Sequence, residues 1–563
     1  MDETYKPIAE RDMEEEAAST PKTALLKIKS SGETDGADEK MLPEDIKKVE
    51  VVSNDDGKLK EGEKQKNGDA KLNIGEPEKL FVGMDKEELL KYANDPFWVR
   101  LRWFLFIGFW TLWAAMLVGA VMIIYAAEKC HPPPPRTWWQ EGPLAELPPD
   151  TTPAQLNQID GNIKGLIIPL TEDAYTSIDQ DHQVVKLLKQ VKEKGTNAII
   201  DLDPAGSHVW FGKSEDVNGP YEDYYIWRPP KTFGADGKPE APNNWINISN
   251  KSSWVYSQKK KQFYYAPTGK PHLNFRNSNV VEEFSKVLKT FLGHGASGVR
   301  IRNAPLLLVD PKFENEMSIS ASTKYDLSQY GFYNHLKTEH LEDLGPLMLT
   351  WRNVVKNMTE NGPFTAAEEL TKLQSYTVNQ SLVVDLPLKA HVFDRVDVNY
   401  IDNNLNLTFK IDGIEWPLWK ANNHNLSRDT LDIVTNLLPG TTLVDANATI
   451  DPKLLKIRQM PSIMRGECSI HKLENETVIA YLRVTSGNPG VLVALNPHDK
   501  TAVINFTTQI PALSKVEELT VQLYSSSYNE TEFMTVNKKV DATKVSVSPK
   551  SVLVLSYVPK KSE

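Results

Sequence analysis

The stretch Gln183–Leu202, QVVKLLKQVKEKGTNAIIDL, decides the fold class of most of this chain. Its first half repeats apolar residues at the spacing of one helical face, and its second half contains Ala198–Leu202, a short apolar run typical of a buried parallel strand. The same order returns where a helical stripe over Val280–Phe291 precedes the run Gly298–Ile301. Repeated helix and strand units of this kind predict a (β/α)8 barrel.

Three more apolar runs are predicted as strands of the same barrel: Ile163–Leu170, Leu347–Leu349 and Leu382–Leu386. After about residue 455 the pattern changes to short alternating runs, which predict an all-β C-terminal domain over 455–563. The strands expected there are Val478–Val484, Val491–Leu495, Leu519–Leu523 and Ser551–Val558.

An uncharged segment, Trp103–Ala127, precedes all of these runs. At about 1.5 Å per residue a helix of this length crosses a hydrocarbon core of about 30 Å. Trp98 and Tyr125 lie near its ends, where amphipathic rings favour the membrane interface. A cleaved signal peptide would begin near the first residue, so a single signal-anchor helix is expected over 103–127.

The flanking charges and the glycosylation motifs both predict the orientation of this helix. Four cations, Lys86, Lys91, Arg100 and Arg102, come before the span, and positive charge stays on the cytosolic side. Every Asn-x-Ser/Thr motif of the list below follows the span, which places the C-terminal part in the lumen or outside the cell. The candidate glycosylation sites are Asn247, Asn250, Asn357, Asn379, Asn406, Asn425, Asn447, Asn475, Asn505 and Asn529.

The segments on either side of the span differ in composition. Residues 1–83 are polar and poor in aromatics, and such a segment cannot bury enough apolar surface to fold, so a disordered cytosolic tail is expected. Beyond the span, Cys130 is followed by His131 and then by four prolines, which favour a stiff polyproline stalk. Cys130 and Cys468 are the two cysteines of the sequence; they can pair internally, stay free or bond another chain.

The net charge excludes one class of partner. At −11, with a pI near 5.6, the chain offers no basic face for phosphates, so no nucleic-acid role is expected. The sequence contains no recognisable metal-ligand set and no cofactor motif. The apolar span makes membrane lipid an expected partner.

Short motifs spread over 137–560 resemble the α-glucosidase and maltase branch of the α-amylase family. They are Trp138-Trp139-Gln140, Ile199-Ile200-Asp201-Leu202-Asp203-Pro204, Trp210-Phe211, Tyr221-Glu222-Asp223-Tyr224-Tyr225-Ile226-Trp227, Leu273-Asn274-Phe275-Arg276-Asn277, Gly298-Val299-Arg300, Trp416-Pro417-Leu418-Trp419 and Leu438-Pro439-Gly440-Thr441. The resemblance implies a barrel over 138–454 with an inserted subdomain at about 204–277, and a C-terminal β-sandwich.

The same resemblance implies three catalytic carboxyl groups, and this chain departs from the family at each expected position. Retaining glycosidases use one carboxylate as nucleophile and another as acid/base. Arg302 stands where Gly298-Val299-Arg300-Ile301-Arg302 aligns with the nucleophile motif, and Thr350 follows the run expected to end in the acid/base Glu. Asn425 replaces the third acid and itself heads a glycosylation motif. Asp201, Arg300 and His424 survive, with Asp201 and Arg300 expected as an ion pair at the barrel mouth.

A glycosidase-like domain without its acids, on a cytosol-first anchor, resembles the heavy-chain subunits of heteromeric amino-acid transporters. That resemblance implies that Cys130 forms a disulfide to a multi-spanning light chain. The light chain would conduct amino acids, large neutral ones included, at the plasma membrane. Thr111, Ala115 and Gly119 lie four apart on one helical face and are candidates for helix packing in the membrane. Cys468 is expected as a buried residue of the β domain.

Two alternative functions are compatible with the sequence. One alternative function is a membrane-bound α-glucosidase or maltase, and another is an adhesion or signalling glycoprotein that binds adhesion receptors. The expected segments are a tail at 1–83, a juxtamembrane helical segment at 84–102, a transmembrane helix at 103–127, a Cys/Pro-rich stalk at 128–137, the barrel at 138–454 and the β domain at 455–563.

Overall fold

The computed structural model describes residues 86–127, 134–175, 182–206, 209–319, 324–473, 475–529 and 535–559. The chain separates into two compact units, Met1–Lys129 and Cys130–Glu563, which are described in turn. The tail predicted over 1–83, most of the predicted stalk and Cys130 lie outside the described residues.

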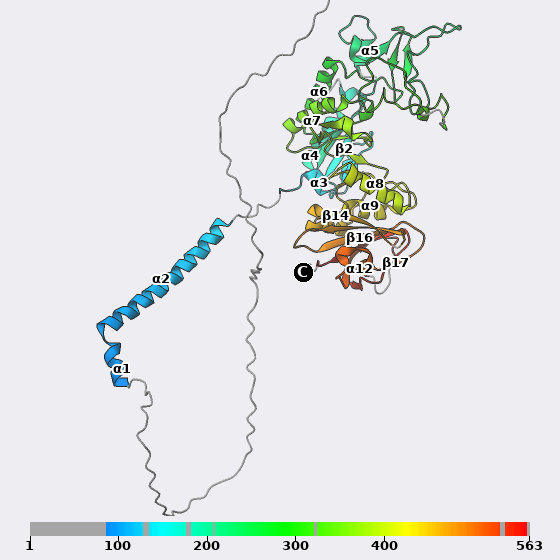
Figure 1. Ribbon diagram of the computed structural model, residues 1–563. Coiled ribbons are helices and arrows are strands. Elements are labelled where there is room, and N and C mark those ends of the chain that lie inside the picture. Colours follow the sequence, from blue (N-terminus) through cyan, green and yellow to red (C-terminus); the bar gives the residue numbers. More distant parts are fainter. Residues whose placement is uncertain are drawn as a thin grey trace, which may run out of the picture. The chain divides into compact units, whose positions relative to one another are not determined.

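The described part of the N-terminal unit, residues 86–127, forms two helices, α1 (Lys86–Ala93) and α2 (Pro96–Ala126) (Figure 1). Asp95 caps α2 by accepting a hydrogen bond from the Phe97 amide at 3.1 Å, and Pro96 occupies the first helical position, where a missing N–H costs nothing. The helix has a mean hydropathy of 2.1 over its most apolar window, and among the described residues it alone is long and apolar enough to cross a membrane.

The start of α2 differs from the predicted boundary at Trp103. The prediction began the helix after Arg102, the last charged residue before the span. Arginine has a high helix propensity, so neither Arg100 nor Arg102 ends a helix. The Arg102 guanidinium donates instead to the Ala93 carbonyl at 2.6 Å. The second half of the predicted juxtamembrane segment is therefore continuous with the span in one 31-residue helix.

The ectodomain is built on an eight-stranded parallel sheet in the order β11-β12-β13-β1-β2-β3-β7-β8. The Asp385 amide donates to the Phe364 carbonyl at 2.8 Å, so the two end strands approach each other and the barrel is nearly closed. The strands are β1 (Leu144–Glu146), β2 (Gly165–Pro169), β3 (Asn197–Leu202), β7 (Gly298–Ile301), β8 (Phe364–Ala366), β11 (Leu388–Lys389), β12 (Leu418–Trp419) and β13 (Thr441–Asp445).

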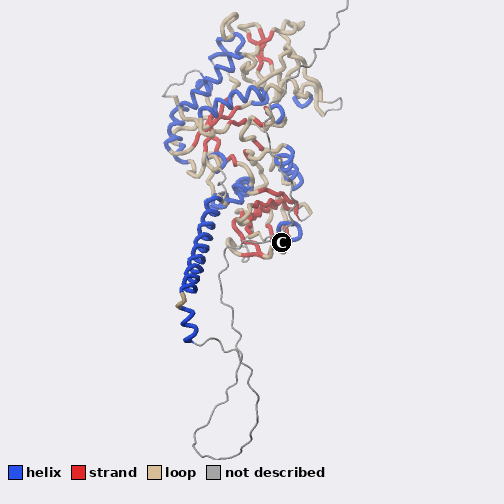
Figure 2. Tube along the Cα trace, turned by 60° about the vertical axis from the view of Figure 1, so that its left-hand side comes forward, coloured by secondary structure: helices blue, strands red, loops and turns tan. Residues whose placement is uncertain are grey.

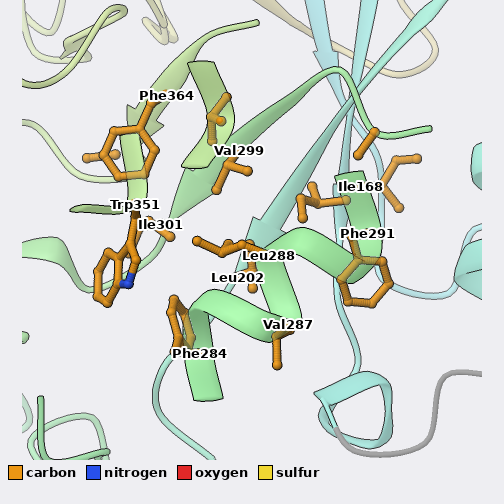
Figure 3. Close-up of a cluster of buried hydrophobic side chains, with 14 of the residues drawn as sticks. Ile168, Leu202, Phe284, Val287, Leu288, Phe291, Val299, Ile301, Trp351 and Phe364 are labelled. Atoms are coloured by element: carbon orange, nitrogen blue, oxygen red, sulfur yellow. The ribbon is translucent and has the colours of Figure 1, made fainter. Parts of the chain in front are cut away.

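Helices cover the outside of this barrel and pack their apolar faces against the side chains of the strands. Figure 3 shows Phe284, Leu288 and Phe291 of one helix lying against side chains of neighbouring strands. The Phe284 ring also contacts Trp351, with ring centroids 4.8 Å apart. Helices around the barrel are α3 (Trp138–Glu141), α4 (Gln183–Glu193), α6 (Ser278–Gly293), α7 (Leu344–Met358), α8 (Val398–Asn406), α9 (Arg428–Leu437), α10 (Pro452–Arg458) and α11 (Pro461–Arg465).

Two of the predicted strands were wrong. Leu347–Leu349 lies inside α7, where Leu344, Met348, Trp351 and Val355 form the buried stripe of a helix. Leu382–Leu386 is mostly a connection: β10 (Ser381–Leu382) pairs antiparallel with β9 (Thr377–Val378), and the barrel strand begins afterwards at Leu388. The predicted strands over 163–170, 198–202 and 298–301 are confirmed.

Two further bodies flank the barrel in the ectodomain (Figures 1 and 2). The inserted subdomain contains α5 (Val209–Ser214) and the sheet β4-β6-β5, with its own core around Trp245 and Trp254. Its strands are β4 (Trp227–Arg228), β5 (Trp254–Ser257) and β6 (Gln262–Tyr265).

The C-terminal part is mainly β, as predicted, but it begins at Glu467 and not at 455, because α10 and α11 occupy the residues before it. Within it lie the short helix α12 (Phe506–Gln509) and the 3-10 turn Pro511–Leu513. A six-stranded antiparallel sheet, β14-β15-β16-β21-β18-β19, and a two-stranded sheet, β17-β20, enclose one apolar core. The other face of the larger sheet packs against α8 and α9. The strands are β14 (Glu467–Leu473), β15 (Val478–Val484), β16 (Gly490–Asn496), β17 (Ala502–Ile504), β18 (Glu518–Tyr524), β19 (Lys539–Asp541), β20 (Val545–Val547) and β21 (Ser551–Tyr557).

Candidate functional site at the barrel mouth

The carboxyl ends of the barrel strands bring charged side chains together, as the topology requires. Asp201 comes from β3, Arg300 and Arg302 come from β7 and its end, and Glu146 ends β1. These four residues and Lys420, which follows β12, form a continuous chain of ion pairs, called here the mouth network.

Asp201 is the centre of the mouth network. Its side chain is fully buried and accepts hydrogen bonds from Arg300 Nε at 2.9 Å and Arg300 Nη2 at 2.8 Å. Arg302 Nε donates to the same carboxylate at 2.5 Å. The predicted ion pair between Asp201 and Arg300 is therefore confirmed, and Arg302 is a second cation on the same carboxylate.

Glu146 is the second carboxylate of the mouth network and connects Arg300 with Lys420. It accepts a hydrogen bond from Arg300 Nη2 at 2.7 Å and another from Lys420 Nζ at 3.2 Å. Burial acts to raise the pKa of Glu146, but the charge and hydrogen bond of Arg300, together with those of Lys420, lower this pKa to about 2. Burial likewise opposes the charge of Arg300, but Asp201 and Glu146 raise the pKa of its guanidinium above its ordinary value. Glu146 and Arg300 therefore both stay ionised at neutral pH.

A carboxyl group that the sequence prediction missed follows the fifth barrel strand. Glu368 comes two residues after β8, at the carboxyl end of a barrel strand, which is the kind of position where an acid/base Glu is expected. Its two carboxylate oxygens accept the amides of Asn303 at 2.8 Å and Ala304 at 3.1 Å, at the turn after β7. Burial raises the pKa of Glu368, although these two hydrogen bonds act in the opposite direction.

The assignment of Thr350 to the acid/base position is thus corrected. Thr350 lies in α7, is exposed, and donates its hydroxyl to the Pro346 carbonyl at 3.2 Å. The error came from the apolar run Leu347–Leu349, which is helical. The signal that could have found Glu368 is the short run Phe364–Ala366, which stands two residues before a pair of glutamates.

The two other residues carried over from the family motifs come after β12. His424 and Asn425 are both exposed, and the Asn425 amide donates to Asn423 Oδ1 at 2.8 Å. Within the described parts of the chain, no hydrogen bond or ion pair joins either residue to the mouth network. In the same parts, no three His, Cys, Asp or Glu side chains gather as metal ligands do.

A cavity of about 730 Å³ opens beside the mouth network, within the range of small-molecule sites. Arg302 and Glu146 form part of its wall, and the turn after β13 forms another part. The lining residues are Glu146, Leu147, Pro148, Pro149, Thr151, Gln155, Gln158, Ile159, Arg302, Asp445, Ala446 and Asn447.

The remaining predicted site residues lie apart from the mouth. Cys468 is on β14 and is a free thiol, half-buried where the sequence predicted a buried residue. Desolvation raises its pKa to about 11, while the charge of Arg483 acts in the opposite direction. Thr111, Ala115 and Gly119 lie on α2, where the Thr111 hydroxyl donates to the Gly108 carbonyl at 2.9 Å.

The candidate glycosylation sites differ in exposure. Asn247 is buried and Asn406 and Asn505 are half-buried. The exposed sites are Asn250, Asn357, Asn379, Asn425, Asn447, Asn475 and Asn529.

Two family models match this chain. Residues 69–145 match the model of the solute carrier family 3 member 2 N-terminus, and residues 173–433 match that of the alpha amylase catalytic domain. The first match covers α1 and α2 and the start of the ectodomain, and the second covers most of the barrel with its insertion.

Curated relatives are of two kinds. The amino acid transporter heavy chain SLC3A1 of Rattus norvegicus is 29% identical over 280 residues, 43% of this chain and 40% of that protein. The human protein of the same name is 28% identical over 296 residues, 45% of this chain and 42% of that protein. The salivary alpha-glucosidase of Anopheles gambiae is 32% identical over 197 residues, 33% of this chain and 32% of that enzyme. The matches thus span about two fifths of the heavy chains and a third of the glucosidase.

Among solved structures, the α-glucosyl transfer enzyme XgtA aligns with a TM-score of 0.58 at 15% identity, over 75% of this chain and 100% of that enzyme. At this identity the likeness establishes the fold alone. By its N-terminal segment and its ectodomain, the chain resembles the heavy-chain subunits of heteromeric amino-acid transporters, and that ectodomain has the glycosidase-like fold of the α-amylase family.

Proposed function

We propose that this protein is a heavy-chain subunit without catalysis of its own, which delivers a multi-spanning amino-acid transporter light chain to the plasma membrane and stabilises it there. The observation that carries the proposal is the pairing of two matches on one chain: the solute carrier family 3 member 2 N-terminus over 69–145 and the alpha amylase catalytic domain over 173–433.

The chemistry of the mouth network favours loss of catalysis. A retaining glycosidase needs a carboxylate nucleophile about 5–5.5 Å from its acid/base group. At the nucleophile position Arg302 offers a guanidinium, which cannot attack an anomeric carbon and whose charge opposes an oxocarbenium-like transition state. Glu368 remains, but both of its oxygens already accept backbone N–H groups.

The charge pattern around α2 supports the topology of the proposal. The N-terminus lies in the cytosol and the ectodomain outside the cell, so the protein is a single-pass type II glycoprotein. Cys130 then stands just outside the bilayer, ahead of the proline stalk, and bridges to the light chain as a disulfide-linked heterodimer. The transported substrates include large neutral amino acids.

Non-reducing electrophoresis of membranes tests the covalent bridge. We expect one high-mass species that reduction converts to the monomer, and that Cys130→Ser abolishes. Cys468→Ser is the matched control, because Cys468 is a half-buried thiol within β14 and its loss should leave the high-mass species in place. A high-mass species that persists in Cys130→Ser, or a monomer under both conditions, contradicts the bridge.

The hydrolase alternative rests on Glu368 and on the similarity to salivary alpha-glucosidases. It is tested with the full-length protein, purified in detergent, and an aryl α-glucoside. We expect no release of the aryl group above that of a mock preparation. Hydrolysis that disappears in Glu368→Gln would make the protein an enzyme and overturn the non-catalytic part of the proposal.

A further inference from the structure

The cavity at the barrel mouth contains a candidate glycosylation site in its own wall. Asn447 lies in the turn after β13 and lines the same 730 Å³ cavity as Arg302. It heads the motif Asn447-Ala448-Thr449. Its side chain is exposed, and among the described residues its carboxamide makes no hydrogen bond, so its nitrogen is available for attachment of a sugar.

The turn that carries Asn447 has a fixed position relative to the opposite wall. The Ala448 amide donates to the Asp445 carbonyl at 3.0 Å, which closes the turn. The Ile450 amide donates to Asp160 Oδ2 at 2.8 Å, which ties the turn to the loop 147–160. The first sugar attached at Asn447 therefore begins at the wall of the cavity, opposite the residues of that loop.

The lining suits the two faces of a sugar ring. Pro148, Pro149 and Ile159 offer apolar contact to ring C–H groups, and Gln158 offers amide hydrogen bonds to hydroxyls. Arg302 uses Nε on Asp201, and 35% of its side chain remains exposed, so its terminal amino groups are donors for hydroxyl or acetamido oxygens. The substitution that removes the nucleophile thus supplies a sugar-binding donor in the same place.

We propose that the first sugars of an N-linked glycan on Asn447 occupy this cavity, so that a covalently held sugar fills the vestigial cleft and braces the loop 147–160 against the β13 turn. Attachment forms a bond from sugar C1 to Asn447 Nδ2, which gives up one proton. The bond from that sugar to the diphosphate of a lipid-linked oligosaccharide donor breaks, and the lipid diphosphate leaves. The inference rests on the luminal orientation proposed above.

Asn379 provides a matched control site. It lies in the exposed turn between β9 and β10, in the motif Asn379-Gln380-Ser381, and it does not line the mouth cavity. The variants Thr449→Ala and Ser381→Ala each remove one motif by deleting an exposed hydroxyl and leave both asparagines in place.

The experiment uses the full-length glycoprotein, purified in detergent and treated with a peptide N-glycosidase in heavy-oxygen water, so that each released site gains a mass label. We expect release at Asn447 to be at least tenfold slower than at Asn379 in the native protein, and the two rates to converge after denaturation. Arg302→Gln should speed release at Asn447 and leave Asn379 unchanged. Hydrogen exchange should rise over 147–160 in Thr449→Ala and not in Ser381→Ala.

The outcomes separate this inference from the proposed function. Equal native release rates at the two sites, or a glycan on Asn379 with none on Asn447, overturn the cavity-bound glycan and leave the orientation standing. Unchanged exchange over 147–160 in Thr449→Ala also overturns it. Absence of glycan from every motif contradicts the luminal orientation, and the inference falls with it.

Discussion

Arg302 Nε donates to Asp201 Oδ2 at 2.5 Å, across the mouth of the barrel. Under the proposed loss of catalysis, this arginine occupies the position expected of a glycosidase nucleophile. Arg300 donates two hydrogen bonds to the same carboxylate, so the buried Asp201 is paired with two cations, Arg300 and Arg302. Asp201, Arg300 and Arg302 therefore form an ion-pair network at the barrel mouth.

Arg300 and Arg302 should contribute very differently to stability. Arg300 is almost fully buried and joins Asp201 to Glu146, so Arg300→Met should destabilise the ectodomain by about 3–5 kcal/mol. Arg302 is about a third exposed, and Arg302→Gln leaves Asp201 bonded to Arg300, so its cost should be only about 0–1 kcal/mol. Thermal unfolding of the purified protein compares the two, and equal losses would contradict this division of roles.

Acid should weaken the barrel mouth through Glu146. Its folded pKa of about 2 lies below the ordinary value of 4.5, so the folded state binds fewer protons than the unfolded state between these values. The stabilisation is therefore complete above about pH 4.5 and is lost as the pH falls towards 2. The unfolding temperature of the wild type should fall more steeply over this window than that of Glu146→Gln, and parallel curves would refute the assignment.

The sequence predicted three of the eight barrel strands, β2, β3 and β7, each of which is a buried apolar run. Ala198–Leu202 and Gly298–Ile301 were identified because each is a buried run flanked by a clear helical stripe. Four strands, β1, β8, β11 and β12, contain two or three residues each, which is too short for any periodicity to appear. Their positions depend on tertiary pairing in the barrel.

The residues of the candidate site were predictable only where they lie on or next to a predicted strand. Asp201 and Arg300 lie on strands that the sequence predicts, and Arg302 directly follows one of them, so their shared position followed from the strand ends. Glu368 was missed because β8 is short and the run Leu347–Leu349 is more apolar, although its helical stripe with Trp351 was visible in the sequence. The cavity around Asn447 depends on loops far apart in the chain, which no local pattern predicts.

Glu368 should act as a structural acceptor. Glu368→Ala leaves the amides of Asn303 and Ala304 without their acceptors, at about 1–3 kcal/mol for each buried donor. Glu360→Ala, at an exposed carboxylate in the connection before β8, is the control and should leave stability unchanged. Chemical unfolding of both variants checks this, and an unaltered midpoint in Glu368→Ala would show that its carboxylate is dispensable for folding.

Cys468 should resist alkylation in the native protein. Burial raises the pKa of its thiol to about 11 from an ordinary 9.0, so the reactive thiolate is on the order of 100-fold scarcer at pH 8. In a Cys130→Ser background, which leaves Cys468 as the single cysteine of the sequence, iodoacetamide should label the native protein slowly and the denatured protein fast. Similar rates in the two states would mean that β14 opens readily or that the thiol is not buried.

The membrane helix should contact the proposed light chain through its small residues. Thr111, Ala115 and Gly119 repeat every four positions on α2, and a repeat of this kind allows a neighbouring helix to approach closely. Gly119→Leu adds a branched side chain to that face and should reduce co-purification of the light chain after reduction of the disulfide, when the membrane contact alone holds the pair. Val121→Leu is the control, because successive helix positions turn by about 100° and Val121 therefore lies on the opposite face. Equal recovery of the light chain with Gly119→Leu and Val121→Leu would place the contact on another face of α2, and a loss confined to Gly119→Leu would locate it along this one.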